Sequence, residues 1–429
     1  MLEYRLNPSD FTRNRCLTIE RTIGLLLSMV CERNGNGYDI ASQNFFSGLS
    51  RHLDEVLDPA RRQSVGEARA KLSWKAFEFL LERANLESDG LPKHLKFRGH
   101  VTRAIDSTTF YTPASKELLQ RFSRRKPGAG SRTHYPYCLC LSAINVYTGQ
   151  PTGAVVDDYL VSERALLIRM IQGFAPGDLA LLDRGLGGGP VYLQFHLSQQ
   201  FFIHRTKSTG KRGTATWVRE FVASGKKQKI VQLTIQNKIT AKAHKMKVRL
   251  ILGPEDSEGK PIVFVTNLLN PNRYTRDDII SLYCKRWKIE TLYGRVKNLL
   301  NIEKFHARSH NGVLQEIFSN FLVLSLTAAA LVALAEKDGV DLRGKLPSFK
   351  NATEVVRRNL LRIVVARPGK TCPRELLDQI LREVRLVTYT VRPGRSFPRV
   401  SMQPVATWSN GRRLRIATYK KNQEAKSLT

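Results

Sequence analysis

A chain of 429 residues is long enough for two or three domains whose cores need no disulfide bonds. Its 69 Lys and Arg residues against 37 Asp and Glu leave a formal net charge of +32, so a polyanion is the expected partner, nucleic acid first and an acidic membrane surface second. The six cysteines are scattered, which argues against a disulfide framework, and the chain starts without a basic and apolar leader, which argues against secretion. The longest apolar run (321–335) is shorter than the ~20 residues of a membrane span, which argues against a membrane protein.

Residues 1–97 are predicted to form a helical domain. Residues 64–84 carry apolar side chains at helical spacing, with Ser64 as the N-cap. Five cations of this region have side chains that could face phosphate: Arg61, Arg62, Arg69, Lys71 and Lys75. A small DNA-binding domain is therefore the preferred interpretation, and a helical packing domain is the alternative.

The hydrophobic period changes at residue 98. The pattern predicts a strand whose C-terminal end carries Asp106, a hairpin turning at 148–151, and a helix capped by Ser162. An apolar strand then stops at Asp183, before a glycine-rich turn, and a helix and a fifth strand follow up to residue 206. Strands alternating with helices predict a mixed sheet covered by helices, and carboxylates at strand ends are typical of active sites in such sheets.

Residues 204–266 are predicted to form a separate β-rich block inserted into this domain. Short runs of alternating apolar residues indicate strands, and the segment is strongly basic. Contact with DNA is the preferred role of these cations, and a solvated basic face is the alternative.

Residues 272–301 are predicted to form one long helix, capped by Thr275 with Asp278 three residues on. At 100° per residue, four polar side chains fall on one narrow stripe: Tyr283, Arg286, Glu290 and Lys297. The apolar side chains lie on the opposite side, ready to pack on a sheet, so the polar stripe is expected to face solvent or a ligand. Taken alone, Glu290 would be an ordinary member of an i,i+4 ion pair.

Together, Asp106, Asp183 and Glu290 offer three carboxylates from two strands and one helix. Such a set could hold two divalent metal ions roughly 3.5–4 Å apart, which activate water or a 3′-hydroxyl and stabilise the leaving oxygen of a phosphodiester. The stripe cations Arg286 and Lys297 suit phosphate oxygens, and Tyr283 can donate a hydrogen bond to one.

These residues occur in an ordered set of motifs. Asp106 lies in AIDSTTF and Asp183 in LLDRG, TNL occupies 266–268, and Glu290 lies in YCKRWKIETLYGRVK. The set resembles the DDE transposases of bacterial insertion sequences, in the cut-and-paste subgroup with a Y-x2-R-x3-E-x6-K signature. The resemblance implies an α/β fold with an RNase H-like catalytic core at 98–340, interrupted by the β-rich insertion at 204–266.

The same resemblance implies roles for individual residues. Asp106, Asp183 and Glu290 would be the catalytic, metal-binding triad for two Mg²⁺ ions, with Mn²⁺ as a possible substitute. Tyr283, Arg286 and Lys297 would contact DNA near the cleavage site, with Trp287 beside them. Outside the span of the resemblance, the composition of residues 341–429 predicts a C-terminal region that ends in a basic tail.

The implied activity is metal-dependent cleavage of double-stranded DNA at the terminal inverted repeats of the element, followed by strand transfer into target DNA. The expected assembly is a dimer in a synaptic complex, in the bacterial cytoplasm and on the nucleoid when bound to DNA. The chain departs from the family at one point, since hairpin-forming members carry a tryptophan near the position of Ile262. Phe264 or Trp217 could supply that aromatic face, although an ordinary core position is the preferred interpretation of Phe264.

Two other functions fit the same residues. A stand-alone nuclease would use the triad without strand transfer, and a catalytically decayed element would leave only a basic DNA-binding protein. The complete triad and the complete polar stripe argue against decay.

Overall fold

The computed structural model describes residues 1–13, 15–31, 37–85, 91–124, 134–210, 213–237, 240–256, 258–338, 345–364 and 372–390. Residues 1–389 form one compact unit, so the division into domains at 97 and 340 stays a prediction. The basic C-terminal tail and the basic connector at 125–133 lie outside the described residues.

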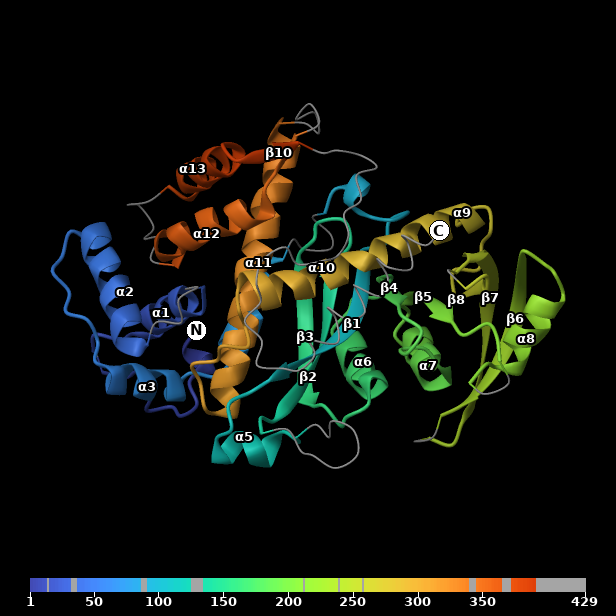
Figure 1. Ribbon diagram of the computed structural model, residues 1–429, viewed down its shortest axis with the longest axis horizontal. Coiled ribbons are helices and arrows are strands. Elements are labelled where there is room, and N and C mark those ends of the chain that lie inside the picture. Colours follow the sequence, from blue (N-terminus) through green and yellow to red (C-terminus); the bar gives the residue numbers. More distant parts are fainter. Residues whose placement is uncertain are drawn as a thin grey trace, which may run out of the picture. The chain divides into compact units, whose positions relative to one another are not determined.

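A mixed eight-stranded sheet forms the centre of this unit (Figure 1). Its strands, in chain order, are β1 (Thr102–Tyr111), β2 (Tyr137–Asn145), β3 (Pro151–Asp158), β4 (Leu179–Leu182), β5 (Phe201–Thr206), β6 (Gln228–Gln236), β7 (Ala243–Glu255) and β8 (Pro261–Thr266). Across the first part the order is β3-β2-β1-β4-β5, with β1, β2 and β3 antiparallel and β4 and β5 parallel to β1. This arrangement is the predicted RNase H-like core.

The three strands of the insertion continue the same sheet. β8 pairs antiparallel with β5, and β7 and β6 follow beyond it, with helix α8 (Thr216–Ala223) also in the insertion. The prediction of strands in this segment is confirmed, and these strands extend the core sheet instead of forming a sheet of their own. The reason is long-range pairing: Ile203 and Thr266 stand opposite each other on β5 and β8, so the chain leaves the core sheet and returns to its edge.

Helices cover both faces of the core sheet. Successive side chains of a strand point to opposite faces, so neighbouring residues pack against different sets of helices. On one face, Ile105 packs in a cluster with the apolar residues of α6 (Glu163–Ile171) and α7 (Gly189–Leu197). On the other face, Ala104 packs in a cluster with residues of the helical run that follows the insertion. This run consists of α9 (Arg276–Cys284), the 3₁₀ turn η3 (Lys285–Trp287), α10 (Lys288–Gly294) and the π-helical turn η4 (Arg295–Leu299).

Helix α11 (His310–Asp338) packs against most of the helices of the two terminal regions (Figure 1). The helices of these regions are α1 (Ile19–Cys31), α2 (Tyr38–Leu53), α3 (Arg62–Lys71), α4 (Lys75–Ala84), α12 (Phe349–Val364) and α13 (Pro373–Arg385). Smaller elements are the 3₁₀ turns η1 (Leu2–Tyr4) and η2 (Lys93–Leu95), helix α5 (Lys116–Arg121), and a ribbon of β9 (Lys345–Pro347) and β10 (Thr388–Thr390). Among the described helices, α11 alone is long and apolar enough to cross a membrane, and 72% of its most apolar window is buried inside the protein.

The N-terminal region is helical as predicted, but two details differ. The helix expected over 64–84 is two helices, and α3 begins after Arg61 instead of Ser64. The chain breaks between them because Leu72 pairs with Arg5 and because the side chain of Asn311 accepts a hydrogen bond from the backbone N–H of Trp74.

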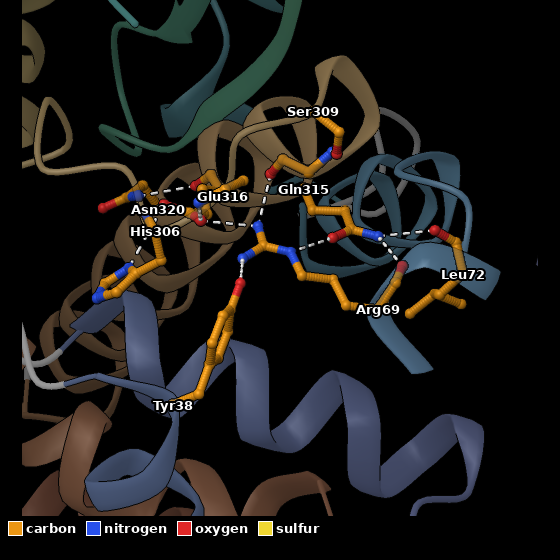
Figure 2. A network of polar contacts seen from close by, with 10 residues as sticks. Tyr38, Arg69, Leu72, His306, Ser309, Gln315, Glu316 and Asn320 are labelled. Atoms are coloured by element: carbon orange, nitrogen blue, oxygen red, sulfur yellow. Dashed lines mark hydrogen bonds and ion pairs between the residues drawn. The ribbon is translucent and has the colours of Figure 1, made fainter. Parts of the chain in front are cut away.

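Arg69 does not face phosphate, contrary to the sequence prediction. Its guanidinium is buried and forms an ion pair of 2.7 Å with Glu316 of α11 (Figure 2). It also donates hydrogen bonds to the Gln315 side chain, the Tyr38 hydroxyl and the Gly312 carbonyl. Arg69 therefore anchors the N-terminal helices to α11.

Candidate active site

The parallel pairing of β1 with β4 brings two aspartates together. The last paired residues are Ile105 and Leu182, and Asp106 and Asp183 directly follow them. Asp106 does not end its strand as predicted, because β1 continues to Tyr111 through antiparallel pairing with β2. The prediction of a strand stopping at Asp183 is confirmed, since β4 ends at Leu182.

Glu290 reaches the same place from the helical run over 276–299. As predicted, Thr275 caps this run: its side chain accepts a hydrogen bond from the Asp278 N–H, and the Asp278 side chain accepts one from the Thr275 N–H. The hydrogen-bond pattern then tightens to a 3₁₀ turn at Lys285–Trp287 and loosens to a π-helical turn at Arg295–Leu299. Glu290 lies on the α-helical turn between the two irregularities, and such irregularities are frequent at functional sites.

The guanidinium of Arg286 lies among the three carboxylates. Its Nη1 is 3.8 Å from Asp106 Oδ2, and its Nη2 is 3.6 Å from Asp183 Oδ1 and 3.8 Å from Glu290 Oε1. The arginine side chain is only 6% exposed, whereas those of Asp106, Asp183 and Glu290 are 27%, 41% and 43% exposed. The carboxylates therefore form an open acidic cluster with a buried cation beneath it.

Arg286 is incompletely satisfied at this position. Its Nε and Nη1 atoms are buried and have no hydrogen-bond partner, because the surrounding carboxylate oxygens lie beyond hydrogen-bond distance. A buried donor without an acceptor costs about 1–3 kcal/mol. Such donors are unusual in native proteins and point to a missing ligand or a strained functional site.

Burial raises the pKa of Asp106 above its ordinary value. A hydrogen bond from the Ser107 N–H and the charge of Arg286 oppose this rise, whereas the nearby carboxylates of Asp183 and Glu163 add to it. A cation with more charge than one guanidinium would favour the ionised form of Asp106.

The polar stripe of the helical run does not face outward as a whole. Tyr283 and Arg286 are buried, which contradicts the prediction, while Glu290 and Trp287 are exposed. The physical reason is that the run crosses the sheet where β4 ends, so the sheet presents polar groups at this point. The Tyr283 hydroxyl donates a hydrogen bond of 3.3 Å to the Leu182 carbonyl, and Arg286 meets the carboxylates.

The remaining stripe residues differ in their surroundings. Lys297 Nζ donates a hydrogen bond of 3.0 Å to the Thr109 carbonyl on β1 and is half-buried. Trp287 is 54% exposed and lies beside Arg286, with the guanidinium carbon 5.5 Å from the centre of its ring. Burial raises the pKa of the Tyr283 hydroxyl, so this group stays protonated and acts as a donor.

The two aromatic residues considered for base stacking also differ. Phe264 is buried against the ring of Tyr283, which confirms it as a core residue. Trp217 is half-buried and lines a cavity of about 630 Å³ together with Arg164, Arg184 and the glycine-rich turn after Asp183. An aromatic side chain therefore lines the same cavity as Arg184, the residue after Asp183, although it comes from α8 and not from β8.

Sequence reasoning missed Tyr293, which supports the site from below. Its hydroxyl donates a hydrogen bond to the backbone carbonyl of Asp106 and accepts one from Ser142 of β2. The side chain is buried, and burial raises its pKa. The only signal in the sequence is its spacing of three residues from Glu290, which places the two side chains on neighbouring positions of the helix.

The cluster has the donor set of a magnesium or manganese site. Three carboxylates face one arginine, which leaves an excess of negative charge, and carboxylate oxygens are the preferred ligands of these hard cations. Within the described residues, no three acidic, histidine or cysteine side chains are yet close enough to coordinate one ion. The residues fit the metal by chemistry, and the intervening guanidinium explains their present separation.

The chain resembles several known proteins. A family model described as the transposase DDE domain matches residues 97–326, more than half of the chain. The transposase InsG for insertion sequence element IS4 of Escherichia coli (strain K12) is 25% identical over 403 residues, covering 90% of this chain and 86% of that protein. A solved piggyBac transposase synaptic complex with hairpin DNA aligns over 94% of this chain and 85% of its own, with 11% identity and a TM-score of 0.43.

The family match includes β1, β4 and the helical run, and so contains all three carboxylates. Members of this family are enzymes that act on DNA and depend on divalent metal ions. The chain therefore belongs to the family of transposase DDE domains and is a DDE transposase of the insertion-sequence type.

Proposed function

We propose that this transposase cleaves DNA strands at the ends of its element and transfers the freed 3′ ends into target DNA, in a cut-and-paste reaction. The observation that carries the proposal is the convergence of Asp106, Asp183 and Glu290 around Arg286. Three carboxylates brought together from β1, β4 and α10 make a site for hydrolysis and transfer of phosphodiesters.

In this proposal Asp106, Asp183 and Glu290 hold two divalent ions, Mg²⁺ or Mn²⁺. When bound, the ions supply an activated water or 3′-hydroxyl and stabilise the leaving oxygen. The backbone N–H of Ser107 and the hydroxyl of Tyr293 keep the Asp106 segment in place, one at the carboxylate and one at the carbonyl.

Arg286 is proposed to bind a phosphate of the DNA. Its Nε and Nη1 have no acceptor, and phosphate oxygens are the acceptors that a guanidinium binds best. Trp287 is exposed next to it, so its ring can contact the nucleotide attached to that phosphate. Lys297 contributes positive charge on the same stripe, whereas the buried hydroxyl of Tyr283 donates to the Leu182 carbonyl and so supports the site from within the fold.

Further DNA contacts are proposed for the insertion and the N-terminal helices. Lys245 and Lys247 stand two residues apart on one face of β7 and are exposed, while Met246 on the other face is buried. In the N-terminal region Arg61 and Arg62 are exposed, unlike the buried Arg69. Binding that uses such cations weakens steeply as salt rises, because it releases condensed counterions from the DNA.

The assembly and location follow from the same reaction. Two ends must be held together for cut-and-paste transposition, so we propose a dimer on two terminal inverted repeats and one target duplex. The expected compartment is the bacterial cytoplasm, where the protein binds the nucleoid. The burial of α11 within the fold supports this location.

The test is a cleavage and joining reaction with labelled element ends, a target plasmid and Mg²⁺. The proposal predicts 3′-hydroxyl nicks that join to the plasmid, and the loss of both products in Glu290→Gln. Asp277→Asn is the matched control, because this exposed carboxylate lies on the same helical run and outside the cluster. Nicks that never join would support a nuclease instead, and cleavage by Glu290→Gln would overturn the site assignment.

A further inference from the structure

Glu163 is a fourth carboxylate near the cluster, on the opposite face of the sheet from Arg286. It is the first residue of α6, the helix whose Leu166 and Leu167 pack in one cluster with Ile105 of β1. Ser107 shares the face of Ile105, because residues two apart on a strand point the same way. The side chain of Ser107 therefore extends toward the start of α6, while Asp106 extends toward Arg286.

A chain of two hydrogen bonds links Glu163 to Asp106. The Ser107 hydroxyl donates a hydrogen bond to Glu163 Oε1. The backbone N–H of the same serine donates a bond of 2.9 Å to Asp106 Oδ1. Glu163 thus holds the side chain of Ser107 on one face of the sheet. This contact keeps the backbone N–H of Ser107 in the position from which it orients the Asp106 carboxylate on the other face.

The start of α6 is itself fastened to the segment after Asp183. Arg164 Nε donates a hydrogen bond of 3.0 Å to the Gly185 carbonyl. Glu163 Oε2 also lies 3.6 Å from the position that a Cβ would take on Gly185. The first two residues of α6 therefore contact both the segment that carries Asp106 and the segment that follows Asp183. These contacts fix the position of Glu163 relative to both segments.

We propose that Glu163 is a positioning residue for Asp106, acting through Ser107, and that it sets the affinity of the acidic cluster for divalent metal ions. This inference rests on the proposed role of Asp106 as a metal ligand. Glu163 itself is not a ligand in this account, because its carboxylate lies behind β1 and accepts the serine hydroxyl. Groups that orient a ligand in this way typically change metal affinity by about 10- to 100-fold when removed.

The test measures Mn²⁺ affinity by isothermal titration calorimetry on the full chain without DNA. Glu163→Ala and Ser107→Ala are each expected to weaken binding by about tenfold or more. The double variant should be no weaker than either single variant, because both changes break the same link. Glu163→Gln should retain most of the affinity, since its amide oxygen still accepts the serine hydroxyl.

Three results would overturn the inference: wild-type affinity in Glu163→Ala, additive losses in the double variant, or a loss in Glu163→Gln equal to that in Glu163→Ala. The last result would show that the negative charge of Glu163 affects metal binding, and not its hydrogen bond to Ser107. Asp157→Asn is the control, because this carboxylate on β3 pairs with Arg121 and Arg169 and does not contact Ser107. Thermal unfolding of each variant identifies any loss of fold.

A separate arm distinguishes this inference from the proposed function. Asp183→Asn must abolish the high-affinity Mn²⁺ binding if the cluster is the metal site. If Asp183→Asn binds Mn²⁺ like the wild type, the proposed function fails. If only Asp183→Asn weakens binding while Glu163→Ala does not, the metal site stands and the role of Glu163 is refuted.

Discussion

Two arginines, Arg69 and Arg286, are equally buried, at 5% exposure each, yet their surroundings differ. Arg69 donates to Gln315, Tyr38, Gly312 and Glu316 at 2.7–2.9 Å, and every one of its nitrogens has a partner (Figure 2). Arg286 has three carboxylates at 3.6–3.8 Å, and two of its nitrogens have no partner.

The difference separates a structural ion pair from a functional one. Glu316, the partner of Arg69, is buried, and the charge of Arg69 with hydrogen bonds from His306 and Arg69 outweighs burial and holds the pKa of Glu316 below its ordinary value. The partners of Arg286 are partly exposed and repel one another. A saturated network stabilises one arrangement of the fold, whereas an unsaturated one leaves room for metal ions and phosphate to complete it.

The largest expected effect concerns the acids around Arg286. Asp183→Asn should abolish strand cleavage while leaving the free energy of unfolding in metal-free buffer unchanged or slightly higher, because it removes one of several like charges. Cleavage of labelled ends and denaturant unfolding measure the two quantities. A variant that still cleaves, or that unfolds several kcal/mol more easily, would erase the distinction between the two arginines.

The acid beside Arg69 should behave in the opposite way. Glu316→Gln leaves a buried arginine charge without its partner, so the free energy of unfolding should fall by about 3–5 kcal/mol. Asp378→Asn is the control, since its pair with Lys337 is exposed and should contribute less than about 1 kcal/mol. Guanidinium denaturation of both variants makes the measurement, and equal losses in the two would contradict the account.

As the pH falls, the region around His204 should lose stability at a higher pH than the network around Arg69 does. Burial lowers the pKa of His204 to about 4, so the unfolded chain takes up this proton first as the pH falls. The free energy of unfolding should therefore decrease between about pH 6.5 and 4, by up to about 3 kcal/mol. His204→Gln should flatten this slope and His94→Gln, at an exposed site, should not; an unchanged slope in His204→Gln would refute the assignment.

The smallest effects concern two glycines near the acidic cluster. A Cβ on Gly187 would lie 2.0 Å from the His204 ring, so Gly187→Ala should lower the free energy of unfolding by about 1–3 kcal/mol. A Cβ on Gly294 would meet nothing within 4 Å, so Gly294→Ala should raise it by about 1 kcal/mol. Thermal unfolding compares them, and the same sign for both would contradict the packing described here.

Much of the site was predictable because its signals are local. The strand that stops before Asp183, the cap at Thr275 and the helical spacing of the polar stripe all follow from short segments. The pairing of β1 with β4 then brings Asp106 next to Asp183, and parallel pairing of this kind is implied by an RNase H-like order of strands.

The errors arose where distant partners decide the outcome. Arg69 was taken for a phosphate contact, because nothing near it in sequence reveals that Glu316 is its partner. The stripe was expected to face outward, because a helical wheel does not show that the sheet offers the Leu182 carbonyl to Tyr283. The sequence did not reveal that the insertion extends the core sheet, because its pairing with β5 joins residues far apart in the chain.

Anomalous diffraction from crystals grown with Mn²⁺ and element-end DNA tests the central claim most directly. The account predicts manganese peaks in contact with Asp106, Asp183 and Glu290, with the guanidinium of Arg286 moved onto a DNA phosphate. Manganese bound elsewhere, or an Arg286 that still lies among three metal-free carboxylates, would contradict it.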